Sequence, residues 1–447
     1  MFPGIIGYEN TVLPQLEHAV LAGHDVIFLG ERGQAKTRMI RGLTSLLDEW
    51  MPIIAGSEIN DDPYAPISAP ARALVAEAGD ETPITWVHRD DRFGEKLATP
   101  DTSIADLIGE VDPIKVAEGR YLSDELTLHY GMVPRTNRGV FAINELPDLA
   151  ERIQVGLLNI LEERDVQIRG YKIRLPLDVL LVASANPEDY TNRGRMITPL
   201  KDRFGAQIRT HYPLEVDVEV GIARQEARLP AGTVCGSQTV GSDSSAAQAH
   251  GLEVRIPYFM EDLVATFTYL ARSSPQINQR SGVSVRLTVA NLETMVAAAT
   301  RRALILGEDV AVPRICDLDA LIASTAGKVE IETLEEGRDA EVIDHLLRGA
   351  ILTVFKNHVS PEAIRQVIDE FDEDVAVNAG DDLTVATYVE TLNKYPAAVA
   401  AVAGLVGDDN SDAVQASGFE LLLEGLHLSK RLNKDATGGR ASYRGRG

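Results

Sequence analysis

The chain has 447 residues, 45% of them hydrophobic, which is enough for two or three domains with buried cores. Its 43 Lys and Arg against 67 Asp and Glu give a formal charge of -24, which would repel nucleic acid and anionic membranes. Cys235 and Cys316 match no metal-ligand spacing and are too few for a disulfide framework. The N-terminus lacks the pattern of a secretion signal, and no apolar run approaches the length of a membrane span. The sequence therefore predicts a cytoplasmic protein that partners neither nucleic acid nor membrane.

The first half of the chain alternates strand and helix patterns. Three apolar runs have the length of buried strands: 26–29, 140–143 and 179–184. Helical periodicity covers 37–50 after the first run and 149–163 between the other two. Because strands joined by helical crossovers form parallel sheets, the sequence predicts an α/β fold with a parallel sheet. Residues 52–100, which prolines, glycines and charges interrupt, predict an inserted substructure instead of a regular element.

Between the second helix and the third strand, alternation about Gly170 predicts a hairpin. The chain after the third strand has a different character. The polar, small residues that follow Ala231 predict a linker. Beyond it the periodicity is helical, most clearly over 260–272 and 287–306, and the final TGGRASYRGRG predicts a flexible basic tail.

A glycine-rich segment, GERGQAKT, lies between the first strand and the following helix. A phosphate-binding loop needs glycines so that backbone N–H groups can face the phosphates, a lysine for the β and γ charges, and a hydroxyl for Mg²⁺. The usual glycine before the lysine is an alanine here, which also leaves open an ordinary strand-loop-helix turn. The predicted nucleotide-binding residues are Gly30, Glu31, Arg32, Gly33, Gln34, Ala35, Lys36 and Thr37.

Polar side chains follow the other two predicted strands. Asn144 and Glu145 end the second strand, and Asn186 follows the third. Ligands bind at the carboxyl ends of strands in open parallel sheets, so we expect these residues near the phosphate loop. There Glu145 would polarise the attacking water and Asn186 would help to orient it. Asn144 stands where an Asp usually holds Mg²⁺, so Thr37 and Asn144 are the predicted metal residues.

These motifs and their order along the chain resemble those of the AAA+ ATPases in the group that includes the MoxR proteins and the ATPase subunit of magnesium chelatase. GERGQAKT is similar to the MoxR form of the loop, in which alanine before the lysine is ordinary. The opening FPGIIGYEN resembles that of the chelatase subunit, and 107–145 resembles its helix-2 insert with the following strand. The hairpin about Gly170 falls where this group carries an insert before the sensor 1 strand. The resemblance covers about residues 2–306.

The resemblance also implies roles for four residues outside the strand ends. Ile6 and Gly7 would lie near the adenine. PLKDRFG is similar to the segment that carries the arginine finger, which implies that Arg203 reaches a neighbouring subunit's nucleotide. SGVSVRLTVANLE resembles the start of the sensor 2 helix, which implies that Arg286 approaches the nucleotide of its own subunit. The alternatives are a surface ion pair of Arg203 with Asp202 or another acid, and a helix-start surface cation for Arg286.

The predicted domains are an AAA+ α/β core (1–228), a linker (229–252), a helical lid (253–330), a helical C-terminal extension (331–434) and a tail (435–447). The resemblance implies a ring, with six subunits, that uses ATP and Mg²⁺ to remodel a partner carrying a von Willebrand factor A domain. Two alternatives stay open. Asn144 favours a nucleotide-gated scaffold with little hydrolysis, and the chelatase resemblance favours a subunit that helps to insert Mg²⁺ into a porphyrin.

Overall fold

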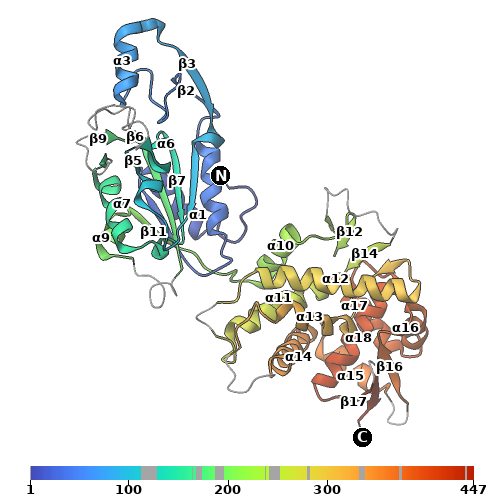
Figure 1. Cartoon of the computed structure of the whole chain (residues 1–447). Coiled ribbons are helices and arrows are strands. Elements are labelled where there is room, and N and C mark those ends of the chain that lie inside the picture. Colours follow the sequence, from blue (N-terminus) through green and yellow to red (C-terminus); the bar gives the residue numbers. More distant parts are fainter. Residues whose placement is uncertain are drawn as a thin grey trace. The chain divides into compact units, whose positions relative to one another are not determined.

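The computed structural model folds into two compact units, Met1–His211 and Tyr212–Gly447, each with its own hydrophobic core (Figure 1). Among the described residues, no helix has both the length and the apolar composition needed to cross a bilayer. The residues that the structure describes are 2–111, 128–163, 165–167, 174–186, 196–236, 238–240, 252–278, 282–331, 338–371, 375–437 and 440–446.

A five-stranded parallel sheet forms the centre of the first unit, in the order β11-β1-β10-β7-β4. The strands are β1 (Val26–Leu29), β4 (Phe93–Leu97), β7 (Gly139–Asn144), β10 (Val179–Ala185) and β11 (Ala206–Arg209). The predicted α/β fold and its three predicted strands are therefore confirmed. Because all strands run in one direction, their carboxyl ends share one edge, and β1 and β7 both pair with β10 there.

Both faces of the sheet are covered, which explains the continuous apolar character of its inner strands. One face, which carries Phe141 and Leu181, packs against α7 (Glu151–Glu163). The opposite face packs against α1 (Val12–Leu21) and α2 (Lys36–Gly42). The helix predicted at 149–163 is confirmed as α7.

The helix predicted at 37–50 is shorter than expected. The α2 helix ends at Gly42, a 3₁₀ turn, η1, covers Leu43–Leu46, and β2 begins at Trp50. Ser45 Oγ donates to the Gly42 carbonyl oxygen at 2.7 Å, and such side-chain bonds to the backbone compete with regular helix.

The segment 52–100 is more regular than predicted. The β2 strand (Trp50–Ile54) pairs antiparallel with β3 (Ile84–His88), and α3 (Ala69–Ala78) lies between them in the chain, together forming one end of the unit (Figure 1). The strand β4 then joins the main sheet beside β7. Sequence analysis missed β4 because this edge strand, FGEKL, is short and polar.

Two further hairpins are present, and the sequence predicted the second of them. In the segment 107–145, β5 (Gly109–Val111) pairs antiparallel with β6 (Leu128–Tyr130), and the residues predicted as insert between them fall outside the described residues. The hairpin before β10 is confirmed as β8 (Asp165–Gln167) and β9 (Arg174–Pro176). Its predicted turn at Gly170 lies outside the described residues.

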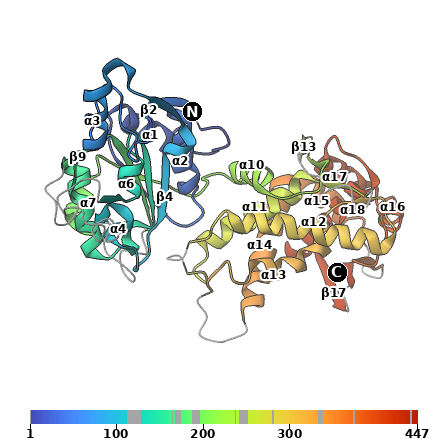
Figure 2. The same cartoon turned by 45° about the horizontal axis from the view of Figure 1, so that its top comes forward.

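The second unit is mostly helical, and α11 (Tyr258–Ser273) and α12 (Arg286–Leu306) lie side by side in it (Figure 2). Both predicted helices are confirmed. The boundary between units differs from the predicted end of the core at 228, since α10 (Val216–Glu226) belongs to the second unit. The buried Glu219 carboxylate of α10 holds it there, because it pairs with Arg272 at 2.5 Å.

Two segments predicted as irregular contain strands. Within the expected linker, β12 (Thr233–Cys235) pairs with β14 (Glu253–Ile256), while 241–251 fall outside the described residues. The prediction of a flexible C-terminal tail is wrong, because β17 (Leu432–Thr437) and β18 (Arg440–Gly445) form a sheet with β16 (Val377–Gly380). Tyr443 anchors this sheet, since its ring is buried and its hydroxyl donates to Glu424 at 2.5 Å.

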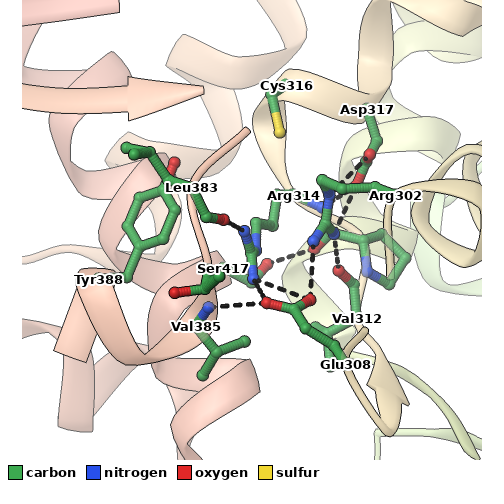
Figure 3. A network of polar contacts seen from close by, with 12 residues as sticks. Arg302, Glu308, Val312, Arg314, Cys316, Asp317, Leu383, Val385, Tyr388 and Ser417 are labelled. Atoms are coloured by element: carbon green, nitrogen blue, oxygen red, sulfur yellow. Dashed lines mark hydrogen bonds and ion pairs between the residues drawn. The ribbon is translucent and has the colours of Figure 1, made fainter. Parts of the chain in front are cut away.

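A buried network of ion pairs joins α12 to the C-terminal helices of the second unit (Figure 3). Arg302 donates twice to the Asp317 carboxylate, at 3.1 and 3.0 Å, and Arg314 pairs with Glu308 at 3.2 Å. Arg314 also lies over the Tyr388 ring of α16 (Val385–Leu392), 4.8 Å from its centroid. The helix α12 is thereby fixed to elements that lie far beyond it in the chain.

We expect Arg302→Ala to lower the free energy of unfolding by about 3–5 kcal/mol, because it leaves the buried Asp317 carboxylate without its main partner. The neighbouring Arg301 is exposed, so Arg301→Ala should change it by no more than about 0.5 kcal/mol. Denaturant unfolding of the full chain, followed by circular dichroism, measures both. Equal effects of the two substitutions would contradict the structural role of the network.

Candidate nucleotide-binding site

The predicted phosphate loop lies between the end of β1 and the start of α2, at the carboxyl edge of the sheet. Gly33 and Ala35 have positive φ angles of 76° and 54°. The second value explains why glycine is usual before the lysine, since alanine in this conformation costs roughly 1–2 kcal/mol. A Cβ at Gly30 would lie 1.9 Å from Thr210 Oγ1 and 2.2 Å from Gln34 Oε1, so glycine is required there.

Lys36 joins the loop to the neighbouring strand. Its side chain is buried, and Nζ donates to the carbonyl oxygens of Gly30 and Glu31, the latter at 2.9 Å. Nζ also donates at 2.5 Å to Oδ1 of Asn186, the residue directly after β10. The ammonium therefore donates both to the loop and to Asn186, the residue predicted to orient the attacking water.

Glu145 completes a chain of hydrogen bonds that begins at Lys36. Asn186 Nδ2 donates to Glu145 Oε2 at 2.7 Å. The backbone of Glu145 is strained, with a φ of 55°, and its N–H donates to Ser184 Oγ at 3.2 Å. Non-glycine residues in this conformation concentrate at functional sites. The structure thus brings Lys36 at the start of α2 together with Glu145 and Asn186, which directly follow β7 and β10, while their roles stay predictions.

Asn144 contacts a residue that sequence analysis did not identify. Its Nδ2 donates to Glu95 Oε1 at 2.5 Å, and its Oδ1 accepts from Ser184 Oγ at 3.2 Å. Glu95 lies on β4, the strand missed above, and its other oxygen accepts from Arg41 Nε of α2 at 2.8 Å. No sequence pattern indicated Glu95, because its role depends on the pairing of β4 with β7.

Oxygen donors at this edge of the sheet include the Thr37 hydroxyl of α2, the Asn144 amide oxygen and the Glu95 carboxylate. Hard oxygen donors of this kind suit Mg²⁺, which needs only one or two protein groups besides nucleotide phosphates and water. Within the described part of the chain, no cluster of three or more His, Cys, Asp or Glu residues could hold a metal by itself. The donor set fits a Mg²⁺ ion that is bound jointly with a nucleotide.

The N-terminal segment predicted near the adenine is fixed to the phosphate loop by Tyr8. The Tyr8 hydroxyl lies 3.1 Å from the Gln34 carbonyl oxygen and 2.7 Å from the His211 carbonyl oxygen. Burial raises the pKa of Tyr8 to about 12, so this hydroxyl stays protonated at neutral pH. Ile6, which is 36% exposed, and Gly7 directly precede this anchor.

The two predicted arginines lie on different units. Arg203 ends α9 (Thr198–Arg203) and pairs with Glu162 of α7 at 2.5 Å, which is a surface ion pair of the kind expected as its alternative role. Arg286 is exposed and is the first residue of α12 in the second unit. In the isolated chain, Arg203 is therefore held on the surface of its own core.

A five-stranded parallel sheet, a glycine-rich loop after β1 and polar residues after β7 and β10 form the arrangement expected for the α/β core of an AAA+ protein. The helical second unit agrees with this class. The relatives of the chain point to the same class.

No family model matches the chain. Over 236 residues it is 28% identical to magnesium-chelatase subunit ChlI of Nostoc sp., a match that covers 51% of this chain and 59% of ChlI. It is 27% identical over 237 residues to the magnesium-chelatase 38 kDa subunit of Rhodobacter capsulatus, covering 50% and 59% of the two chains. The chain thus spans less than two thirds of the length of these relatives.

Among solved structures, the chain is similar to one from the complex between subunits BchI and BchD of magnesium chelatase, which is based on a cryo-EM reconstruction. The match has 20% identity and a TM-score of 0.38, and it covers 76% of this chain and 98% of the other. The sequence relatives support an AAA+ ATPase of the MoxR and magnesium-chelatase group, so the predicted resemblance is confirmed.

Proposed function

We propose that the chain binds ATP with Mg²⁺ and hydrolyses it to change the conformation of a partner protein. The observation that carries this proposal is the hydrogen-bond chain from Lys36 through Asn186 to Glu145 at one edge of the sheet. This chain links a cation suited to phosphate with a carboxylate suited to polarising water. A site that only stored nucleotide would have use for the lysine but not for the carboxylate.

Each side chain has a step in this proposal. Lys36, which donates to two loop carbonyls, would donate instead to the β- and γ-phosphate oxygens. Glu145 would accept a hydrogen bond from the attacking water, and Asn186 would hold its carboxylate in place. Bound Mg²⁺ would supply positive charge at the phosphates, with Thr37 and Asn144 as its protein partners.

The remaining site residues imply an assembly. Ile6 and Gly7 would contact the adenine, and Arg286 would approach the phosphates of its own subunit. Arg203 would stabilise the charge that develops on a neighbour's γ-phosphate. Because that contribution requires an adjacent subunit, we propose a ring, with six subunits by resemblance to the group.

Substitution of Lys36 tests the binding step. Lys36→Ala should weaken binding of a fluorescent ATP analogue by about tenfold to a hundredfold, because a hydrogen bond to a charged group contributes about 1.5–3 kcal/mol. The matched control is Arg72→Ala, which removes an exposed cation of α3 and should leave the affinity unchanged. Equal affinities for wild type and Lys36→Ala in a fluorescence titration with Mg²⁺ would contradict the proposed site.

We also propose that the partner being remodelled carries a von Willebrand factor A domain, as the resemblance to this group implies. No metal-binding D-x-S-x-S run of that domain occurs in this sequence. We propose that a separate chain supplies the domain. Capture from native cells in the presence of ATP identifies it, and the Lys36→Ala chain serves as the control for nucleotide dependence.

The second candidate function is the ATPase subunit of a magnesium chelatase, which the 27–28% identity to chelatase subunits favours. The insert at β2–β3 and the extension beyond residue 330 are additions to a minimal subunit of that kind. Absence of chlorophyll and bacteriochlorophyll from the source organism would exclude this candidate.

A further inference from the structure

The carboxylate that the site lacks on β7 is present on the neighbouring strand. In the parallel pair of β4 and β7, Glu95 lies opposite Ala142, two residues before Asn144. Side chains two residues apart on a strand share one face, so Glu95 lies on the same face as Asn144. The 2.5 Å contact between Asn144 Nδ2 and Glu95 Oε1 agrees with this register.

The helix α2, which carries the predicted metal residue Thr37, lies on the same face. Ala142 packs in the same core as Met39 and Ile40 of α2. Arg41 of α2 donates to Glu95 Oε2 at 2.8 Å. Since Thr37 lies four residues before Arg41, both are on one side of the helix, about one turn apart. Glu95 is therefore adjacent to the side of α2 that carries the Thr37 hydroxyl.

The charges of this cluster explain why residue 144 is an asparagine. An aspartate there would place two carboxylates about as close as the present 2.5 Å contact, and like charges at that distance disfavour ionisation of both. The asparagine amide replaces this repulsion with a hydrogen bond. Together, Asn144 and Glu95 carry one negative charge, as an aspartate at position 144 beside a neutral residue at position 95 would. The charge lies on β4 instead of on β7.

We propose that Glu95 is the acidic residue of the Mg²⁺ site, where it holds water molecules of the ion while Asn144 positions its carboxylate. This inference rests on the proposed binding of Mg²⁺ with ATP. The ion pair with Arg41 does not block the role, because the Arg41 side chain is 64% exposed and such pairs are weak. Mg²⁺ would take the place of Arg41 as the cation beside Glu95.

Four chains test this inference: wild type, Glu95→Gln, Asn144→Asp, and the double variant that exchanges the two functional groups. Bound Mn²⁺ is measured by electron paramagnetic resonance in the presence of ADP. Glu95→Gln should weaken Mn²⁺ binding about tenfold, the usual scale for groups that hold metal ligands in place. The double variant should recover most of the loss, because it restores one carboxylate beside one amide.

A second measurement needs no metal or nucleotide. In EDTA, Asn144→Asp should lower the midpoint of thermal unfolding by roughly 2–4 °C, and adding Glu95→Gln should reverse this change. Arg41→Gln is the control for the competing cation and should tighten Mn²⁺ binding about twofold to fivefold.

The outcomes separate the inference from the proposed function. If wild type binds ADP and Mn²⁺ but Glu95→Gln has the same Mn²⁺ affinity, Glu95 only packs beside Asn144 and the inference is wrong. If wild type binds no ADP under any condition, the proposed function fails and the inference fails with it. ADP affinity measured in EDTA gives the effect of each substitution on the nucleotide alone, and only a change in Mn²⁺ affinity beyond that effect belongs to the metal site.

Discussion

Glu145→Gln should lower the rate of phosphate release by about 10³-fold, because it removes the carboxylate that polarises the attacking water. The substitution keeps the shape of the side chain and one acceptor oxygen for Asn186, so bound ATP should persist and not be lost. Steady-state phosphate release measures the rate, and filter binding of radiolabelled ATP measures the trapped nucleotide.

The control for Glu145→Gln is the same chemical change at an exposed site, Glu77→Gln on α3. It should leave both measurements at the wild-type value. If wild type and Glu145→Gln release phosphate at one background rate across a wide range of Mg²⁺ concentrations, the chain does not hydrolyse ATP. The nucleotide-gated scaffold would then replace the proposed function.

Arg203→Ala should keep ATP binding and lose most turnover, since removing a transition-state charge clamp in trans costs on the order of 10³-fold. The reason is geometric, because Arg203 lies partly exposed on its own core and pairs there only with Glu162 and the Pro199 carbonyl among the contacts described. In a ring the guanidinium would exchange Glu162 for the γ-phosphate of the next subunit. Light scattering with ATP should show the assembled ring.

Glu162→Gln separates this role from a structural ion pair. If the Arg203–Glu162 contact only stabilises the core, both substitutions should lower the unfolding midpoint slightly and neither should affect turnover. If Arg203 acts on a neighbour, Glu162→Gln should leave turnover intact while Arg203→Ala abolishes it. A monomer whose ATPase rate is unchanged by Arg203→Ala would exclude the arginine-finger role.

The sequence pattern alone was sufficient to predict those parts of the fold in which the preference of each segment agrees with its place in the tertiary structure. The strands β1, β7 and β10 are buried on both faces, so their apolar runs are visible in the sequence. The phosphate loop and the two strand ends that carry Glu145 and Asn186 follow from these strands and from the parallel direction of the sheet.

The features that were missed depend on tertiary contacts. The edge strand β4 contains only two large apolar residues, and its identity comes from pairing with β7. Glu95 was missed together with it, since only the register brings this side chain to Asn144. The C-terminal segment predicts a tail because its sequence is basic and glycine-rich, whereas the structure shows that Tyr443 anchors it by burial and by its bond to Glu424.

The buried network around Arg302 links α12 to the C-terminal helices, so these elements should move together. Arg286 and Arg302 are 16 residues apart on this 21-residue helix, which is about 24 Å along its axis. A tilt of about 10° around the Arg286 end would displace the Arg302 end by roughly 4 Å. The network fixes Asp317, Arg314 and Tyr388 to that end, so the C-terminal extension would move with it. If Arg286 approaches the phosphates of its own subunit, as proposed, the loss of one phosphate group there would become a movement of several ångströms at the far end of α12.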